Sequence, residues 1–414
     1  MTEPTELRIL AHQSFREKLA RRQFLQVGGA AGAGLLLSAC GGSSSDAGSS
    51  SGSSDGGGGE GVAEASGDYS RVINKASGDL AMYTWGDYND PDIVGQQAAD
   101  ALDVTMRVDF YSSNEDLIAK LEGSNGTSGF DIIAPTGPYI PQMVQKGLLQ
   151  KLDKTLLPNM SNIDPIYLNR DWDPDNEYGV CKDWGSTGWL YNKTMISTEI
   201  KTWADFISVC QTEASGNCAI LDSPPNLTGM YFWANGINWT TEDAADLDAC
   251  EDFLVNEFAS HVKAFDSYPS DKIAEGAYSI AMMWNGDARQ AYAKVADAGG
   301  NPDDWVWQLG APATEIWMDL YAIPTGAPNP EAAHAWINWL LIPEISMKDL
   351  AYHGYHSGMK NIDTLLSELY PDLPRPEMIF FTEEQVATMQ TGAVNSAQDR
   401  MVDIYNKVLA AAGS

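Results

Sequence analysis

Leu80-Ala-Met-Tyr-Thr-Trp85 is a short apolar and aromatic run of the kind that forms a buried β-strand. Asp90 and Pro91 follow it as the N-cap and the first position of a helix. The same patterns alternate further along the chain, as a strand at 104–110, a helix at 115–121, a strand at 130–135 and a helix at 139–146. Strands and helices in alternation predict an α/β fold with a parallel sheet.

The middle and the end of the chain carry further segments of both kinds. Strands are predicted at 184–191, 218–222, 278–284 and 316–324. Helices are predicted at 202–210, 246–258, 330–341, from 383 onward and at 401–412. The chain after residue 79 has a length that suits two lobes rather than one.

Three predicted strand ends pair an aromatic residue with an acid. They are Trp85-Gly86-Asp87-Tyr88, Trp284-Asn285-Gly286-Asp287 and Trp317-Met318-Asp319. The carboxyl ends of strands in open α/β sheets face the ligand crevice, so we expect the three segments to meet there. Aromatic rings attract ammonium groups and carboxylates pair with them. The pattern therefore predicts a site for a flexible organic cation.

Each of these residues also has a purely structural interpretation. Trp284 suits a core position, and Asp87 and Asp287 suit turns beside glycine. Asp319 is different because it interrupts an apolar strand, where an unpaired carboxylate is costly. We therefore expect either an Arg or Lys side chain or a cationic ligand beside Asp319.

The first forty residues have the three parts of a bacterial export signal. Arg21-Arg22-Gln23-Phe24-Leu25 is a twin-arginine start, an apolar run covers 27–37, and Leu37-Ser-Ala-Cys40-Gly41 reads as a lipobox. We predict a twin-arginine lipoprotein signal peptide over 1–39 and lipidation of Cys40, which would hold the protein outside the cytoplasmic membrane. The alternative is a short anchor that stays attached, although the run is too short to span a bilayer.

Residues 40–78 are predicted to be a flexible, disordered linker. From Gly41 to about Ser66 the chain is almost all Gly and Ser, and such a composition cannot bury enough apolar surface to fold. The formal net charge of −32 repels nucleic acids and anionic lipid headgroups and attracts cations. Solubility in salty or acidic surroundings explains the bulk charge equally well.

Four cysteines follow the predicted lipidation site, and no catalytic motif accompanies them. They are Cys181, Cys210, Cys218 and Cys250. An exported protein can form disulfides, and three pairings are open, whereas the lack of a Cys-x-x-Cys pair disfavours zinc. His353-x-x-His356 and the acidic run 171–175 suit surface and turn roles better than metal binding. Without a nucleophile elbow, phosphate loop, zinc-protease or dinucleotide motif, we predict no enzyme, no metal and no cofactor.

Nine short motifs occur in a fixed order over about residues 80–412. They are Tyr83-Thr-Trp-Gly-Asp-Tyr88, Ser113-Asn-Glu115, Phe130-Asp-Ile-Ile-Ala-Pro135, Lys151-Leu-Asp-Lys154, Ser161-Asn-Ile-Asp-Pro165, Asp173-Pro-Asp-Asn176, Met283-Trp-Asn-Gly286, Trp317-Met-Asp319 and Ala322-Ile-Pro324. In this series the chain resembles the extracytoplasmic spermidine/putrescine-binding proteins of polyamine ABC transporters. The resemblance implies a two-lobed periplasmic-binding-protein fold, type II-like, that closes around a cleft. It places 79–187 with 311–360 in lobe 1, and 188–310 with 361–414 in lobe 2.

The resemblance also assigns roles in ligand binding. Trp85, Tyr88, Trp284 and Trp317 would wall the ligand, Asp87 and Asp319 would hold its ammonium groups, Thr136 and Tyr355 would contact it, and Asp287 matches an acid of the putrescine-selective branch. The implied protein is a monomeric extracytoplasmic receptor. It would bind putrescine or spermidine and deliver it to the permease subunits of an ABC transporter.

Two departures from the family pattern bear on specificity. Family members carry acids in the turn after the strand that ends at Asp222, whereas this chain has Ser223-Pro-Pro-Asn226 there. An aromatic residue expected after Thr136 is replaced by Gly137-Pro138. A receptor of the same fold for betaine, another organic cation, an amino acid or a sugar therefore stays open, as does an adhesive or signalling lipoprotein.

Overall fold

The computed structural model of the protein describes residues 69–124 and 128–413. The predicted signal peptide 1–39, the predicted lipidation site Cys40 and most of the predicted linker lie outside these residues. Within the described ranges, no helix combines the length and the apolar composition needed to cross a membrane.

The first lobe is built on a sheet of mixed direction with the strand order β2-β1-β3-β9-β4. Its strands are β1 (Gly78–Trp85), β2 (Val104–Tyr111), β3 (Ile132–Ile133), β9 (Thr314–Ala322) and β4 (Gly179–Asn192). Strand β1 runs parallel to β2 and β3, as the sequence predicts. Strand β9 runs antiparallel to both β3 and β4, so the sheet is mixed beyond the parallel unit that the sequence predicts.

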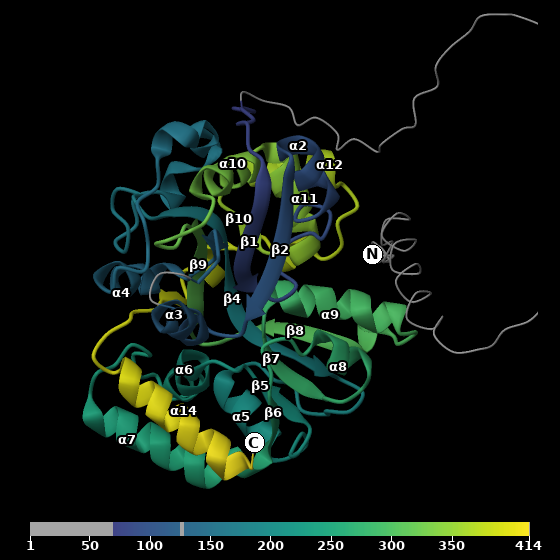
Figure 1. The fold of residues 1–414 in the computed structure, drawn as a ribbon. Helices are drawn as coiled ribbons and strands as arrows, with labels where there is room; N and C mark the ends of the chain where they lie inside the picture. Colours follow the sequence, from purple (N-terminus) through teal and green to yellow (C-terminus); the bar gives the residue numbers. More distant parts are fainter. Residues whose placement is uncertain (1–68, 125–127, 414) are drawn as a thin grey trace, which may run out of the picture.

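Helices cover this first sheet and close its core. They are α2 (Gln96–Leu102), α3 (Asn114–Gly123), α4 (Ile140–Gln145), α10 (Pro330–Leu340), α11 (Pro343–His353) and α12 (Ile362–Leu369). Helix α10 shows how the sequence decides the packing, because Trp336, Trp339 and Leu340 share its apolar face and all three are buried. Figure 1 shows α10, α11 and α12 gathered at the upper end of β1 and β2.

The second lobe continues from the same long strand, β4. After Ser186, β4 leaves β9 and pairs antiparallel with β7 (Ile280–Trp284) and β8 (Trp305–Leu309). Strand β7 is parallel to β5 (Cys218–Ile220), which is parallel to β6 (Val262–Phe265). Alternate side chains of β4 enter opposite cores, with Trp189 on one face and Leu190 on the other.

Helices also cover the second sheet. They are α5 (Trp203–Gln211), α6 (Pro224–Ala234), α7 (Ala244–Phe253), α8 (Ser270–Ala274), α9 (Asn285–Asp297) and α14 (Gln398–Ala412). The predicted helix 246–258 is shorter than expected, since a π turn at Leu254–Phe258 follows α7. Figure 1 shows α7 and α14 side by side at the lower end of the molecule.

The last part of the chain, after residue 360, contacts both lobes in turn. Helix α12 packs on α11 through a core that includes Met347, Leu350 and Leu365. Strand β11 (Met389–Thr391) then pairs with β9 of the first lobe. Met378 packs into the second-lobe core that contains Leu190, and Ala397 and α14 join the other core of that lobe. We therefore propose that the third crossing, predicted near residue 360, is gradual, because the chain contacts the second lobe at Met378, returns to β9 through β11 and joins the second lobe again with α14.

Candidate functional site

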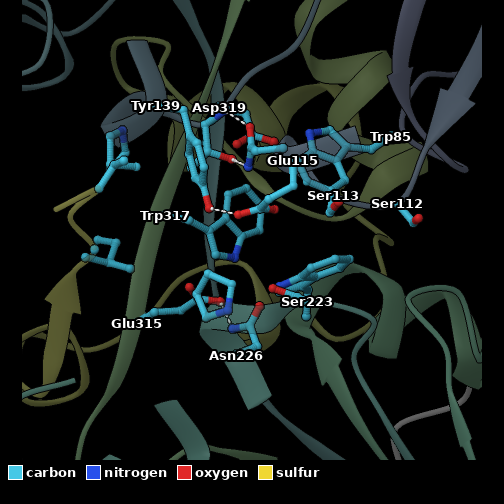
Figure 2. A pocket seen from close by; sticks show the side chains of 18 of the residues that line it. Trp85, Ser112, Ser113, Glu115, Tyr139, Ser223, Asn226, Glu315, Trp317 and Asp319 are labelled. Atoms are coloured by element: carbon cyan, nitrogen blue, oxygen red, sulfur yellow. Dashed lines mark hydrogen bonds between the residues drawn. The ribbon is translucent and has the colours of Figure 1, made fainter. Parts of the chain in front are cut away.

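A pocket of about 990 Å³, its open mouth included, lies between the two lobes. Eight of the nine residues that the sequence analysis names as ligand contacts line it: Trp85, Tyr88, Thr136, Trp284, Asp287, Trp317, Asp319 and Tyr355. They come from the ends of β1 and β7, from the first turn of α9, from β9 and from the loops after β3 and α11. The three segments that the sequence predicts to meet all line this pocket, although Trp317 and Asp319 stand inside β9 and not at a strand end. Figure 2 shows Trp85, Trp317 and Asp319 around it.

Strand β9 supplies three of the lining side chains. Glu315, Trp317 and Asp319 are two residues apart in the strand and therefore project from the same face. All three line the pocket, and Figure 2 shows Trp317 between Asp319 on one side and Glu315 on the other. We call this row of acid, aromatic and acid the β9 ladder.

Asp319 is buried, with 4% of its surface exposed, and has few partners. Its Oδ2 lies 2.8 Å from the hydroxyl of Tyr88. Its Oδ1 has no hydrogen-bond partner, and no cation pairs with the carboxyl group, among the residues that the structure describes. Burial and the nearby charge of Asp183 raise the pKa of Asp319 to about 8.

Asp287 lies close to this end of the pocket, in the first turn of α9. The hydroxyl of Tyr355 donates a hydrogen bond to Oδ2 of Asp287, and the backbone NH of Asp287 lies 3.3 Å from the same hydroxyl. Burial raises the pKa of the Asp287 carboxyl to about 7. The Tyr88 and Tyr355 rings lie 5.8 Å apart, so Asp287 and Asp319 share one neighbourhood.

Two further acids line the pocket, and the sequence analysis did not assign a role to either. Glu115 accepts hydrogen bonds from the Tyr139 hydroxyl at 2.8 Å and from Gln398 Nε2 at 2.5 Å. Glu315 accepts from Asn226 Nδ2 at 2.6 Å. Burial raises the pKa of both carboxyl groups.

Signals for both acids are present in the sequence. Glu315 obeys the two-residue alternation that selects Trp317 and Asp319, but the predicted strand begins one residue after it, whereas β9 begins at Thr314. Glu115 occurs in one of the quoted motifs, at a helix start where acids are common for electrostatic reasons. The sequence pattern around Glu115 is therefore explained by its position at the start of a helix, and it does not by itself indicate ligand binding.

The electrostatics of the pocket are one-sided. Four carboxyl groups line it, those of Glu115, Asp287, Glu315 and Asp319, while no Lys, Arg or His side chain among the described residues does so. Buried carboxylates without a counter-charge are costly, so the arrangement is complementary to a positively charged ligand. The described residues contain no group of three or more His, Cys, Asp or Glu side chains placed to hold a metal ion.

Aromatic rings form the walls between the acids. The rings of Trp85 and Trp284 meet edge to face across the lobes with centroids 5.8 Å apart. Trp317 meets Tyr355 in the same manner at 4.8 Å. Trp85 is fixed by a hydrogen bond from its Nε1 to the carbonyl of Ala134 at 2.9 Å. Such rigid walls favour the methylene chain and the ammonium groups of an organic cation.

Asp87 is the one named residue that the structure places outside the pocket lining. It adopts a left-handed backbone conformation with φ of 51°, and its carboxylate pairs with Lys294 at 3.1 Å. Gln290 of the same helix also donates to the Asp87 carbonyl at 3.3 Å. Since Asp87 belongs to the first lobe and Lys294 to the second, this contact joins the lobes at the rim.

Tyr268 makes a second contact between the lobes. Its hydroxyl accepts from the backbone NH of Gly86 at 2.9 Å and donates to the carbonyl of Tyr111 at 2.6 Å. A Cβ at Gly86 would lie 3.0 Å from the Tyr268 ring, so the close approach needs glycine there. The structure therefore shows the cleft with its two lobes in contact.

The remaining sequence candidates lie away from the pocket. His353 is buried beside Lys182, Asp183 and Asp349, and burial together with the Lys182 charge holds its pKa well below the usual range. His356 is also buried, and its Nδ1 contacts the Ser357 carbonyl. All four cysteines are buried and free. Neither group is arranged as a metal site in the described part of the chain.

Two α/β lobes joined by a shared strand, with a charged and aromatic cleft between them, define a solute-binding protein. Residues 94–374 match the family model described as bacterial extracellular solute-binding protein. The chain belongs to this family.

Individual relatives agree with this assignment. The chain is 31% identical over 302 residues to the spermidine/putrescine-binding periplasmic protein of Escherichia coli strain K12, covering 71% of this chain and 83% of the relative. It is 28% identical over 324 residues to the putrescine-binding periplasmic protein SpuD of Pseudomonas aeruginosa, covering 75% and 86%. Among solved structures, a putative spermidine/putrescine ABC transporter protein from Listeria monocytogenes superposes with a TM-score of 0.70 at 24% identity, covering 80% and 98%. The predicted periplasmic-binding-protein fold is confirmed.

Proposed function

We propose that this protein captures a polyamine, putrescine or spermidine, outside the cytoplasmic membrane and delivers it to the permease of an ABC transporter. The observation that carries this proposal is the set of four carboxyl groups around a pocket walled by Trp85, Trp284 and Trp317. Three of them are buried, and none of the four pairs with a cation among the described residues. The names of the relatives from Escherichia coli and Pseudomonas aeruginosa support it.

Capture would proceed by closure rather than by reaction. Both lobes contribute acids, since Glu115 and Asp319 belong to the first and Asp287 to the second. An ammonium group that meets Asp319 and Asp287 together therefore favours the closed arrangement. The contacts of Tyr268 and Asp87 across the lobes show which surfaces meet in that arrangement.

The chemistry of the pocket disfavours the alternative ligands. Amino acids and betaine carry a carboxylate, which the four acids would repel. A sugar offers no charge to compensate the buried carboxyl groups. A monoamine compensates one of them only.

We also propose that the mature protein is a monomer attached to the membrane through lipid on Cys40. The lipobox Leu37-Ser-Ala-Cys40-Gly41 after a twin-arginine start supports the anchor. Labelling of cells with a radioactive fatty acid tests it, because Cys40→Ser is expected to remove the label and release the protein.

Thermal unfolding of the Cys40→Ser protein with a panel of solutes tests the binding function. We expect putrescine or spermidine to raise the melting temperature in proportion to the logarithm of its concentration, as ligands specific for the folded state do. Betaine, arginine and maltose are the controls. A shift with one of these controls and none with any polyamine would overturn the proposal.

A further inference from the structure

One acid of the pocket stands apart from the other named residues. Glu315 begins the β9 ladder, four residues before Asp319, and the two Cα atoms are therefore about 13 Å apart along the strand. Figure 2 shows Glu315 beside Asn226, on the opposite side of Trp317 from Asp319. The pocket thus has an acidic group at each end of one aromatic ring.

The surroundings of Glu315 hold its carboxyl group in place without neutralising it. Asn226 Nδ2 donates to its Oε1 at 2.6 Å, and the Thr187 hydroxyl donates to the same oxygen. Glu315 is 7% exposed, and no ion pair to it occurs within the described ranges. Both neighbours are uncharged, so the position keeps a buried acid that is oriented but lacks a cation.

Asp319, at the opposite end of the β9 ladder, also lacks a cation and, independently, a full set of hydrogen-bond partners. Oδ1 of Asp319, which is 4% exposed, has no hydrogen-bond partner in the described part of the chain. Both acids of the ladder therefore face one cavity without a cation among the described residues.

Asn226 lies in the first turn of α6, where the family resemblance implies an acid. Asn226 carries no charge, and its side-chain amide donates to Glu315. The acid at this end of the cleft is therefore Glu315, near the start of β9.

We infer that Glu315, held by Asn226 and Thr187, binds the second ammonium group of the ligand, which lies extended along the β9 ladder across Trp317. This inference rests on the proposed polyamine function and deepens it. The ligand class it defines is an amine charged at both ends, either an α,ω-diamine or a longer polyamine. A monoamine would leave Glu315 unpaired.

The inference is tested by removing the charge of Glu315 from the protein and, separately, the second amine from the ligand. Calorimetry would measure the affinity of the Cys40→Ser protein for putrescine, cadaverine, spermidine and 1-aminobutane, which has the carbon chain of putrescine but one amine. The variant Glu315→Gln keeps the shape and the acceptor oxygen and removes the charge. Glu122→Gln is the matched control, since Glu122 is a surface acid paired with Lys146 and does not line the pocket.

The expected result is selective. Glu315→Gln weakens binding of the tightest diamine or polyamine at least about tenfold, the effect of one charge-assisted hydrogen bond. It changes the affinity for 1-aminobutane less than about twofold, and Glu122→Gln changes neither.

Two results would contradict the inference in different ways. If Glu315→Gln leaves the ratio of diamine to monoamine affinity unchanged while Asp319→Asn abolishes binding, the role of Glu315 is wrong and the polyamine function stands. If the unsubstituted protein binds none of the four amines, the proposed function fails and the inference with it. The melting temperature of each variant without ligand shows that it is folded.

Discussion

The hydroxyl of Tyr88 lies 2.8 Å from Oδ2 of Asp319 and also contacts a carboxylate oxygen of Asp183. A tyrosine hydroxyl has one proton, so it donates to one of these acids and must accept from the other. Lys182 lies 3.0 Å from Asp183, whereas Asp319 has no cation in the described part of the chain. Asp319 is therefore the acid that carries a proton before the ligand arrives, in agreement with its raised pKa.

This relationship predicts that polyamine binding releases protons. The pKa of Asp319 is raised to about 8 and that of Asp287 to about 7, mainly by burial, so both acids hold protons at pH 6. An ammonium group binds the deprotonated form, so affinity is expected to rise from pH 6 to pH 8. Calorimetry at pH 6.5 in buffers of different ionisation enthalpy measures the protons released. Equal affinity at pH 6 and pH 8 would contradict the prediction.

Replacement of Asp319 is expected to change ligand affinity and protein stability in opposite directions. We expect Asp319→Asn to weaken polyamine binding by more than about 1.5 kcal/mol, because a charge-assisted hydrogen bond is lost. Without ligand it should raise the melting temperature, because an uncompensated buried acid is removed.

The stability gain in Asp319→Asn should depend on pH in a defined direction. The folded protein retains the Asp319 proton up to about pH 8, whereas the unfolded chain loses it near pH 4, so this acid lowers the free energy of unfolding progressively between these values. The difference in melting temperature between variant and parent is therefore expected to grow from pH 5 to pH 8. A constant difference would assign the effect to another cause.

Trp284 is expected to contribute through its ring. It is half-buried, packs against the cores of both lobes and meets Trp85 edge to face. Trp284→Ala should weaken binding by about 0.5–2 kcal/mol, the range for stacking and cation–π contacts. Trp284→Phe should restore part of the loss. Circular dichroism of both variants separates lost contacts from lost structure, and full affinity in a folded Trp284→Ala protein would refute the role.

Asp87 should behave unlike Asp319, although the sequence patterns of the two are similar. Its carboxylate is half-exposed and pairs with Lys294, and pairs of this kind contribute about 0–1 kcal/mol. We expect Asp87→Asn to change affinity less than about fivefold, with a smaller effect at high salt, because the contact joins the lobes and does not touch ligand. Loss of binding as severe as in Asp319→Asn would return Asp87 to the ligand contacts.

The structure favours one pairing among the free cysteines. The thiols of Cys210 and Cys218, at the end of α5 and the start of β5, are neighbours that influence each other's pKa. Cys181 belongs to the core of the first lobe and cannot reach the others. Mass spectrometry after oxidation by a disulfide-exchange reagent is expected to find a bond between Cys210 and Cys218 only. A bond that includes Cys181 would contradict the arrangement of the cores.

Local sequence patterns predicted which residues line the pocket better than they predicted the sheet. Trp85, Trp284 and Asp319 stand at positions where apolar strands end or are interrupted, and such positions are visible in one segment of sequence at a time. The antiparallel placement of β9 between β3 and β4 depends on partners far away in the chain, which local patterns do not contain.

The sequence prediction places two acids wrongly relative to the pocket lining: it omits Glu315, which lines the pocket, and includes Asp87, which does not. Glu315 was missed because strand boundaries are the least certain part of a pattern, and a strand that starts two residues earlier brings it into the cleft. Asp87 follows an aromatic and a glycine like the true lining acids, but its φ of 51° turns the side chain toward Lys294. The rotation of one residue decides between ligand contact and surface ion pair.

Strand β4 pairs with β9 as far as Ser186, opposite Ile316, and from Thr187 onward it pairs with β7, opposite Trp284. We therefore expect a rotation that opens the cleft to twist β4 near Ser186 and Thr187. The hydroxyl of Thr187 is the group that donates to Glu315. Glu315, the proposed contact for the second ammonium group, is therefore hydrogen-bonded to the part of β4 that we expect to twist. We expect the fraction of protein with bound ligand and the opening angle of the cleft to vary together.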